Sequence, residues 1–181
     1  MADPEFTLLG DALWLDFVNT SRGRSASPPD LLPDPAAYHR WTKAEKLVSD
    51  VEAVPFPVIL AFRRELTHLA EALSAGRQPP SSAIAAINAR LSGQPGHEQL
   101  VRTAGAWGLP FAPDRPPPAL DAVARSAAVT LADHTRTVRQ CAGDPCSLLF
   151  LDASPTQSRF WCSSVDCGGK GRIERRRGLQ R

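Results

Sequence analysis

The C-terminal part of this chain is organised around four cysteines, the only ones in its 181 residues. They form two close pairs with the spacing Cys141-x4-Cys146-x15-Cys162-x4-Cys167. Thiolates suit Zn²⁺, and two such pairs separated by a loop can surround the ion tetrahedrally. The spacing therefore predicts a structural zinc site with four cysteine ligands. Disulfides or a redox switch are the alternatives, and a reducing cytoplasm disfavours a structural disulfide.

The bulk composition predicts a cytoplasmic protein that does not enter a membrane. The sequence contains no 18-residue apolar run, and its first residues, Met1 to Glu5, lack the basic and apolar regions of a secretory signal. A chain of this length with 43% hydrophobic residues has room for one ordinary domain and a small accessory module.

Positive charge is concentrated directly after the last cysteine. The net charge of the chain is only +2, yet the segment from Gly168 to Arg181 holds six basic residues and one acidic residue. A basic run beside a zinc module is typical of a nucleic-acid contact, and a solvated tail is the simpler alternative. The candidate DNA-contacting residues are Lys170, Arg172, Arg175, Arg176 and Arg177.

The first 138 residues are predicted to form a mostly helical domain. Apolar residues at helical spacing, proline and serine start signals and a glycine stop predict helices near residues 13–20, 57–75 and 81–91. Asp34-Pro35 is expected to open a further short helix that contains Tyr38 and Trp41. A long helix from Leu120 to Val138 is expected to run almost into Cys141. The segment from His97 to Ala112 is interrupted by glycines and favours two short strands, a β-hairpin.

Residues 139–181 are predicted to form a small zinc module resembling a treble clef. Leu148–Asp152 and Ser158–Trp161 are expected to pair as a β-hairpin around a turn at residues 153–157. Ser163 or Ser164 can cap a following helix that carries Cys167 in its first turn. The expected fold class is therefore mainly α, with a C-terminal zinc module of hairpin and helix. Arg159 and Lys170 are expected to offset part of the charge of the four thiolates.

These residues resemble the CGNR zinc finger found in bacterial proteins. The resemblance rests on Cys141, Cys146, Phe150, Asp152, Arg159, Trp161, Cys162, Cys167 and Gly168. The N-terminal Leu15 to Thr20, Leu-Asp-Phe-Val-Asn-Thr, together with Arg64-Glu65-Leu66 and Asn88, resembles the accompanying ABATE domain of putative stress-induced transcription regulators. The resemblance implies a helical N-terminal domain and a zinc module that contacts DNA. After Cys167-Gly168, however, Gly169 and Lys170 stand where the family has asparagine and arginine.

Two functions from different classes remain open on the sequence. The first is a zinc-dependent DNA-binding regulator of a stress response, for which high specificity would need a homodimer presenting two half-sites. The second is a domain that binds a small-molecule effector, or an enzyme, with the finger as a structural or docking appendage. The residues that could line its pocket are Asp16, Asn19, Thr20, Arg64 and Asn88. The alternative interpretation of these polar residues is helix capping and a buried hydrogen-bond network that fixes the fold. Catalysis is not expected, because the histidines are scattered singly and the sequence has neither a nucleophile elbow nor a phosphate-binding loop.

Overall fold

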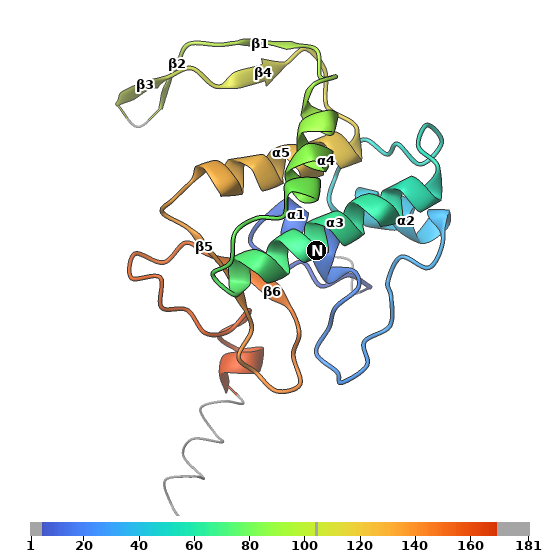
Figure 1. Cartoon of the computed structure of the whole chain (residues 1–181), viewed down its shortest axis with the longest axis vertical. Helices are drawn as coiled ribbons and strands as arrows, with labels where there is room; N and C mark the ends of the chain where they lie inside the picture. The colour runs from blue at the N-terminus through green and yellow to red at the C-terminus, as the bar shows by residue number, and fades with distance from the viewer. Residues whose placement is uncertain (1–4, 104, 170–181) are drawn as a thin grey trace, which may run out of the picture.

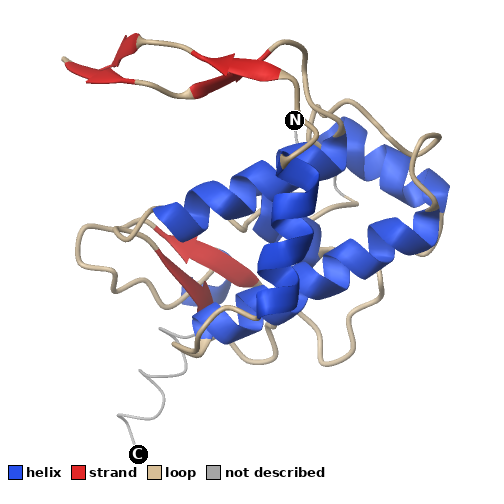
Figure 2. Cartoon of the chain, turned by 45° about the horizontal axis from the view of Figure 1, so that its top comes forward, coloured by secondary structure: helices blue, strands red, loops and turns tan. Residues whose placement is uncertain are grey.

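The computed structural model describes residues 5–103 and 105–169, and shows a mainly α-helical protein with small strand pairs (Figures 1 and 2). The helices are α1 (Leu13–Asn19), α2 (Pro35–Ala44), α3 (Phe56–Ser74), α4 (Ser81–Leu91) and α5 (Ala119–Ala132). The strands are β1 (Gly96–Glu98), β2 (Val101–Thr103), β3 (Ala106–Gly108), β4 (Phe111–Pro113), β5 (Thr137–Gln140) and β6 (Leu149–Asp152). A further helix begins at residue 166 and continues to the last described residue.

The short helix α1 lies at the centre of the helical body and contacts α3, α5 and β6. All but the first of its residues are buried, including the polar Asp16 and Asn19, so the helix is enclosed on nearly all sides. Phe17 packs on Trp41 of α2 with ring centroids 5.0 Å apart. The indole N–H of Trp14 donates to the Thr130 hydroxyl of α5 across 3.0 Å, which satisfies the polar end of a fully buried side chain.

Local signals in the sequence identify some helix ends correctly. The Asp34 side chain accepts a hydrogen bond from the Ala37 N–H at 2.7 Å, so α2 begins with the predicted cap followed by Pro35. Gly76 takes a positive φ of 66° just after α3, as the predicted stop requires. The predicted serine cap of α4 is wrong, because Ser81 is already helical and Pro80 stands at the cap position without a side-chain bond.

The predicted long helix from Leu120 to Val138 is also wrong, since α5 ends at Ala132. Asp133 adopts an extended backbone, and its side chain accepts from the N–H and the hydroxyl of Thr135 at 2.9 and 2.6 Å. Such a local turn competes with helical hydrogen bonding. The chain then enters β5, where Val138 is buried as a strand residue.

The hairpin of the C-terminal module has a different partner from the one predicted. β6 pairs antiparallel with β5, in the register Val138 opposite Leu151, and not with residues 158–161. The later segment approaches by other bonds, including the Ala142 N–H to the Phe160 carbonyl at 2.8 Å. The first cysteine pair therefore lies in the connection between the two strands of the hairpin.

β6 is buried on both faces and separates two apolar clusters. Leu149 and Leu151 belong to the main core of the helical body, whereas Leu148 and Phe150 pack with the four cysteines. Alternation of side chains along a strand explains this division, and burial on both faces explains the unbroken apolar run. The boundary predicted between residues 138 and 139 falls within β5, and the division into two domains stays a prediction.

A thin β-ribbon formed by β1 to β4 projects away from the helices (Figures 1 and 2). β1 pairs with β4 and β2 with β3, both antiparallel, so the predicted hairpin in this region is present but is divided into four short strands. Among residues 5–103 and 105–169, no helix is both long and apolar enough to cross a membrane.

Candidate metal centre

The four cysteines come together from four separate points of the fold. Cys141 follows β5, Cys146 lies in the turn before β6, Cys162 ends the segment that returns beside the hairpin, and Cys167 lies in the helix that begins at residue 166. The Ser163 hydroxyl accepts from the Asp166 N–H at 3.1 Å, so this helix has the predicted serine cap. All four side chains are buried.

The sulfur positions fit a tetrahedral metal site. All four Sγ atoms lie within 4.8 Å of one another, with Cys146 and Cys162 separated by 3.9 Å and Cys162 and Cys167 by 3.7 Å. A tetrahedron with zinc–sulfur bonds of about 2.3 Å has edges of about 3.8 Å. The four thiols are free, and these separations are far longer than a disulfide bond. The geometry fits Zn²⁺ bound by four sulfurs.

The electrostatics of the cluster allow four thiolates only beside a bound cation. Burial, together with the neighbouring thiols, raises the pKa of Cys146 to about 11 and raises the pKa of Cys162 as well. Burial opposes ionisation of Cys141 too, but the backbone N–H groups of Cys162 and Gly143 lower its pKa. Four thiolates cannot coexist here without compensation, and a divalent ion supplies it. Because sulfur fills every position, the centre has no site for an activated water and is structural.

Gly143 allows the chain to pass close to the metal ligands. A Cβ at this position would lie 3.0 Å from the Cβ of Cys167 and 3.4 Å from its Sγ. Only glycine avoids this contact without displacing the last helix. Gly143 was not predicted from its sequence position, although a glycine between two ligands of a pair suits a tight turn at a metal.

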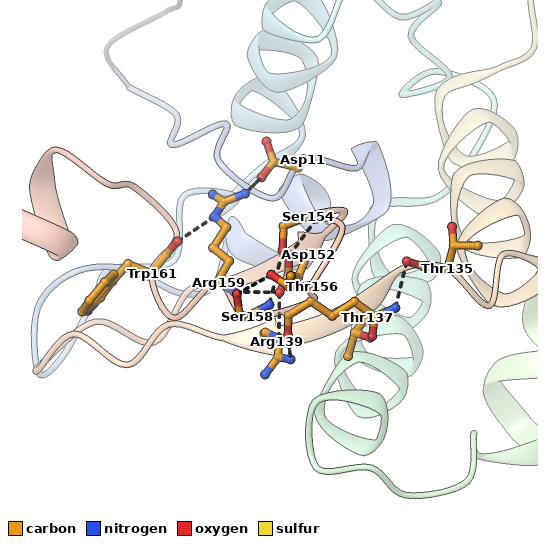
Figure 3. A network of polar contacts seen from close by, with 11 residues as sticks. Asp11, Thr135, Thr137, Arg139, Asp152, Ser154, Thr156, Ser158, Arg159 and Trp161 are labelled. Carbon is orange, nitrogen blue, oxygen red and sulfur yellow. Dashed lines mark hydrogen bonds and ion pairs between the residues drawn. The ribbon is translucent and has the colours of Figure 1, made fainter.

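Arg159 connects the finger to the N-terminal segment (Figure 3). Its guanidinium donates to the carbonyl oxygens of Trp161, at 2.8 Å, and Cys162, and forms an ion pair with Asp11. It also lies 4.5 Å from the centroid of the Phe150 ring. Arg159 therefore supports the backbone that carries a ligand, whereas Lys170, the other predicted compensating residue, lies outside the described residues.

Asp152 anchors the other end of the same network. Its buried carboxylate accepts from the Arg139 side chain at 3.0 Å, the Ser154 N–H at 3.0 Å and the Arg159 N–H at 2.9 Å. Burial alone would raise the pKa of Asp152, but the hydrogen bonds from Ser154 and Arg159 and the Arg139 charge hold it below its usual value. The carboxylate thus fixes the turn and the returning segment against the hairpin.

Arg24 is a charged neighbour of the metal site that sequence reasoning missed. It lies in the loop after α1, bonds to Asp166 at 3.0 Å, and is close enough to Cys162 and Cys167 for their thiolate charge to raise its pKa against the effect of burial. The neighbouring Gly23 and Ser147 exchange hydrogen bonds of 2.8 and 3.1 Å. No local pattern reveals this contact, because the two segments are far apart in the sequence.

Asn19, predicted as a pocket residue, instead joins α1 to the hairpin. Its amide donates to the Leu149 carbonyl at 2.8 Å and accepts from the Leu149 N–H at 3.0 Å. The Leu151 N–H donates to the Gly10 carbonyl at 2.8 Å along the same edge of β6. Asn19 is 1% exposed and takes the place of a neighbouring strand's peptide group.

The other predicted pocket residues are either bonded within the fold or exposed. Asp16 is buried and accepts from the Gly10 N–H at 2.8 Å, and the Thr20 hydroxyl donates to the Phe17 carbonyl at 2.6 Å. Arg64 on α3 and Asn88 on α4 are exposed. This arrangement agrees with the alternative interpretation, a hydrogen-bond network that fixes the fold.

The buried arginine of this region is Arg63, one residue before the predicted Arg64. It donates to the Thr20 hydroxyl at 2.9 Å and forms a bidentate ion pair with Asp30 at 2.8 and 2.6 Å. Position 63 lies on the same helical stripe as Phe62 and Leu66, a signal that the sequence contained.

Three cavities lie elsewhere on the described surface, and none is lined by the five predicted pocket residues. One of these three, of about 360 Å³, is an open groove along α5 beside Asp11, Arg125 and Arg136. Both arginines already have partners. Arg125 donates to the Phe111 carbonyl at 2.9 Å, and Arg136 forms an ion pair with Asp133 at 2.9 Å. The groove therefore presents no spare charge to a ligand.

The predicted DNA-contacting residues, Lys170, Arg172, Arg175, Arg176 and Arg177, lie outside the described residues. The structure does show where the chain leaves the metal site towards them, which is the helix that carries Cys167.

Two protein-family models match the chain, one in the N-terminal part and one in the part that holds the cysteines. A model described as "Putative stress-induced transcription regulator" (ABATE) matches residues 11–134, and one described as "CGNR zinc finger" matches residues 137–178. The second match includes all four cysteines, so the cluster is a zinc centre. A search of curated proteins returned no match.

Proposed function

Because the chain belongs to the family of putative stress-induced transcription regulators, we propose that it regulates transcription by binding DNA through the basic segment that follows its zinc site. The family membership and the zinc finger support a regulator. The contact with DNA, the stress signal and the cytoplasmic location belong to the proposal.

The observation that carries the proposal is the position of Cys167. It is a metal ligand and lies in the first turn of a helix, and the basic run begins three residues later in the sequence. Zinc therefore fixes the start of the segment that holds Lys170, Arg172 and the arginines from 175 to 177. A helix start held by the metal gives the basic residues that follow in the sequence a defined origin from which to reach a duplex.

The chemistry of this segment favours phosphate contacts over base reading. Lys170 occupies the position where the family has an arginine. A lysine lacks the planar guanidinium that forms bidentate hydrogen bonds with guanine or with a phosphate. We therefore expect salt-dependent binding with modest sequence selectivity for a single chain. The closed four-sulfur centre supports binding as the role of the module, since it offers no coordination position for catalysis.

The test is the affinity of the zinc-loaded protein for a mixed-sequence DNA duplex, measured by fluorescence anisotropy over a series of salt concentrations. The test variant is Arg175→Ala/Arg176→Ala/Arg177→Ala. The control variant, Arg64→Ala/Arg77→Ala/Arg115→Ala, removes the same charge from three exposed arginines of the helical part.

The proposal predicts that log affinity falls linearly with log salt concentration. Each lost phosphate contact should make the slope shallower by about 0.9 in the test variant. The control variant should keep nearly the wild-type slope. Absence of binding at low salt, or equal losses in the two variants, would overturn the proposal.

A further inference from the structure

The projecting arm is one continuous two-stranded ribbon. Glu98 lies opposite Phe111 in the first strand pair and Val101 opposite Gly108 in the second, so both pairs share a single register. Between them the Gln99 N–H donates to the Pro110 carbonyl at 3.0 Å. Side chains of alternate residues therefore share a face over the whole length of the ribbon.

One face of this ribbon is apolar and exposed. Leu100, Trp107 and Leu109 lie on it and are 64%, 67% and 55% exposed. Arg102 lies on the same face, 5.9 Å from the Trp107 ring. Phe111 continues the face towards the helical body, where Arg125 lies 5.2 Å from its ring. We define the apolar ribbon face as Glu98, Leu100, Arg102, Trp107, Leu109 and Phe111.

This face has the properties of an interface. A two-stranded ribbon is only marginally stable alone in water, and a tryptophan beside a pair of leucines is costly to expose. Aromatic and arginine side chains are enriched at the centre of protein interfaces. The ribbon extends away from the helical body, so a partner can approach it (Figure 2).

The order of residues makes the face complementary to itself. If two copies stack face to face about a twofold axis at Leu100 and Leu109, each strand runs antiparallel over its own equivalent. Glu98 of one copy then lies opposite Arg102 of the other, because both are two residues from Leu100. By the same symmetry, Trp107 of one copy lies opposite Phe111 of the other. Opposite charges and aromatic pairs thus meet on both sides of an apolar centre.

We propose that the apolar ribbon face is a homodimer interface that takes a second copy of this chain in this twofold stacked register. The proposal stands on the ribbon alone and does not require that the protein bind DNA. The contact is small compared with the roughly 800 Å² that each partner contributes to a standard interface, so the dimer should be weak and concentration-dependent.

The test is sedimentation velocity of the full zinc-loaded chain over a wide concentration range. Trp107→Ala should raise the dimer dissociation constant by about tenfold or more, whereas Val48→Ala, which trims an exposed apolar residue outside the ribbon, should not change it. Glu98→Arg alone and Arg102→Glu alone each place like charges opposite one another and should weaken the homodimer by at least about tenfold.

The decisive experiment mixes the two single charge variants, Glu98→Arg and Arg102→Glu. Every cross-chain pair in a mixed dimer is then one arginine with one glutamate, so the mixture should associate nearly as well as the wild type. The double variant Glu98→Arg/Arg102→Glu should recover association by the same reasoning. A monomeric wild type, association that ignores the ribbon variants, or failure of the mixture to recover would each overturn the proposal.

Discussion

Asn19 shows how one side chain joins the two parts of the sequence. It completes the outer edge of β6 by donating to and accepting from the same residue, Leu149, at 2.8 and 3.0 Å. The acidic neighbour Asp16 holds the chain entering α1 through the Gly10 N–H at 2.8 Å. The sequence allowed Asp16 and Asn19 to line a pocket or to belong to a buried hydrogen-bond network. Their hydrogen-bond partners agree with the network.

Asn19→Ala should destabilise the protein by about 2–6 kcal/mol, because it leaves the N–H and the carbonyl of Leu149 buried without partners at about 1–3 kcal/mol each. Urea unfolding of the zinc-loaded protein measures this change. Asn88→Ala, at an exposed position of α4, is the matched control and should shift the free energy of unfolding by less than about 0.5 kcal/mol. Equal effects of the two substitutions would contradict the role given to Asn19.

Asp16 should make the free energy of unfolding depend on pH near neutrality. Burial raises the pKa of Asp16 to about 7, against about 3.9 for an aspartate in an unfolded chain. Between these values the folded protein keeps a proton that the unfolded chain has released. This contribution is therefore complete below about pH 4 and is lost as the pH rises through about 7, at no more than about 1.4 kcal/mol per pH unit.

Asp16→Asn should remove this slope, since an amide does not titrate but can still accept from Gly10. Urea unfolding at a series of pH values from about 5 to about 8 tests the difference. Glu52→Gln at an exposed position serves as the control and should keep the wild-type slope. A wild-type slope that persists in Asp16→Asn would refute the assignment.

At the scale of elements, the sequence is informative wherever a signal is local. Asp34-Pro35 and Gly76 mark helix ends that the structure confirms, and the apolar stripes of α1 and α3 identify the core. The end of α5 and the partner of β6 could not be predicted in the same way. Val138 suits a helix stripe and a buried strand equally well, and only its pairing with Leu151 decides between them.

The metal site follows the same logic. Its four ligands were predicted from spacing, because cysteine pairs are rare enough in a sequence to be informative. Arg24 could not be predicted from the sequence, because its contact with the site depends on the packing of α1 against β6. Arg63 was missed by one position, although the helical stripe already pointed to it.

Zinc removal should loosen the segment returning from the hairpin while leaving the hairpin in place. Val138, Leu149 and Leu151 pack in the main core, whereas residues 159–167 depend on the metal cluster. Chelation should therefore speed tryptic cleavage after Arg159 with little change after Arg139, which lies in β5. Mass spectrometry of the fragments, beside circular dichroism of the helices, distinguishes the sites. Equal acceleration at both arginines would show that the hairpin also depends on zinc.

For the whole molecule, the hairpin β5–β6 transmits order from the helical core to the zinc centre. One face of β6 completes the core, the other covers the cysteines, and zinc in turn fixes the helix from which the basic segment continues. If the chain binds DNA as proposed, loss of zinc should reduce the affinity, because the start of this segment is no longer held in place.

The central claim is a closed zinc centre made of sulfur alone, and X-ray absorption at the zinc edge of the purified protein tests it most directly. The structure predicts one zinc ion for each chain, with four sulfur ligands at about 2.3 Å. A nitrogen or oxygen ligand, or fewer than four sulfurs, would contradict the claim, because the centre would then have an open position or a different set of ligands.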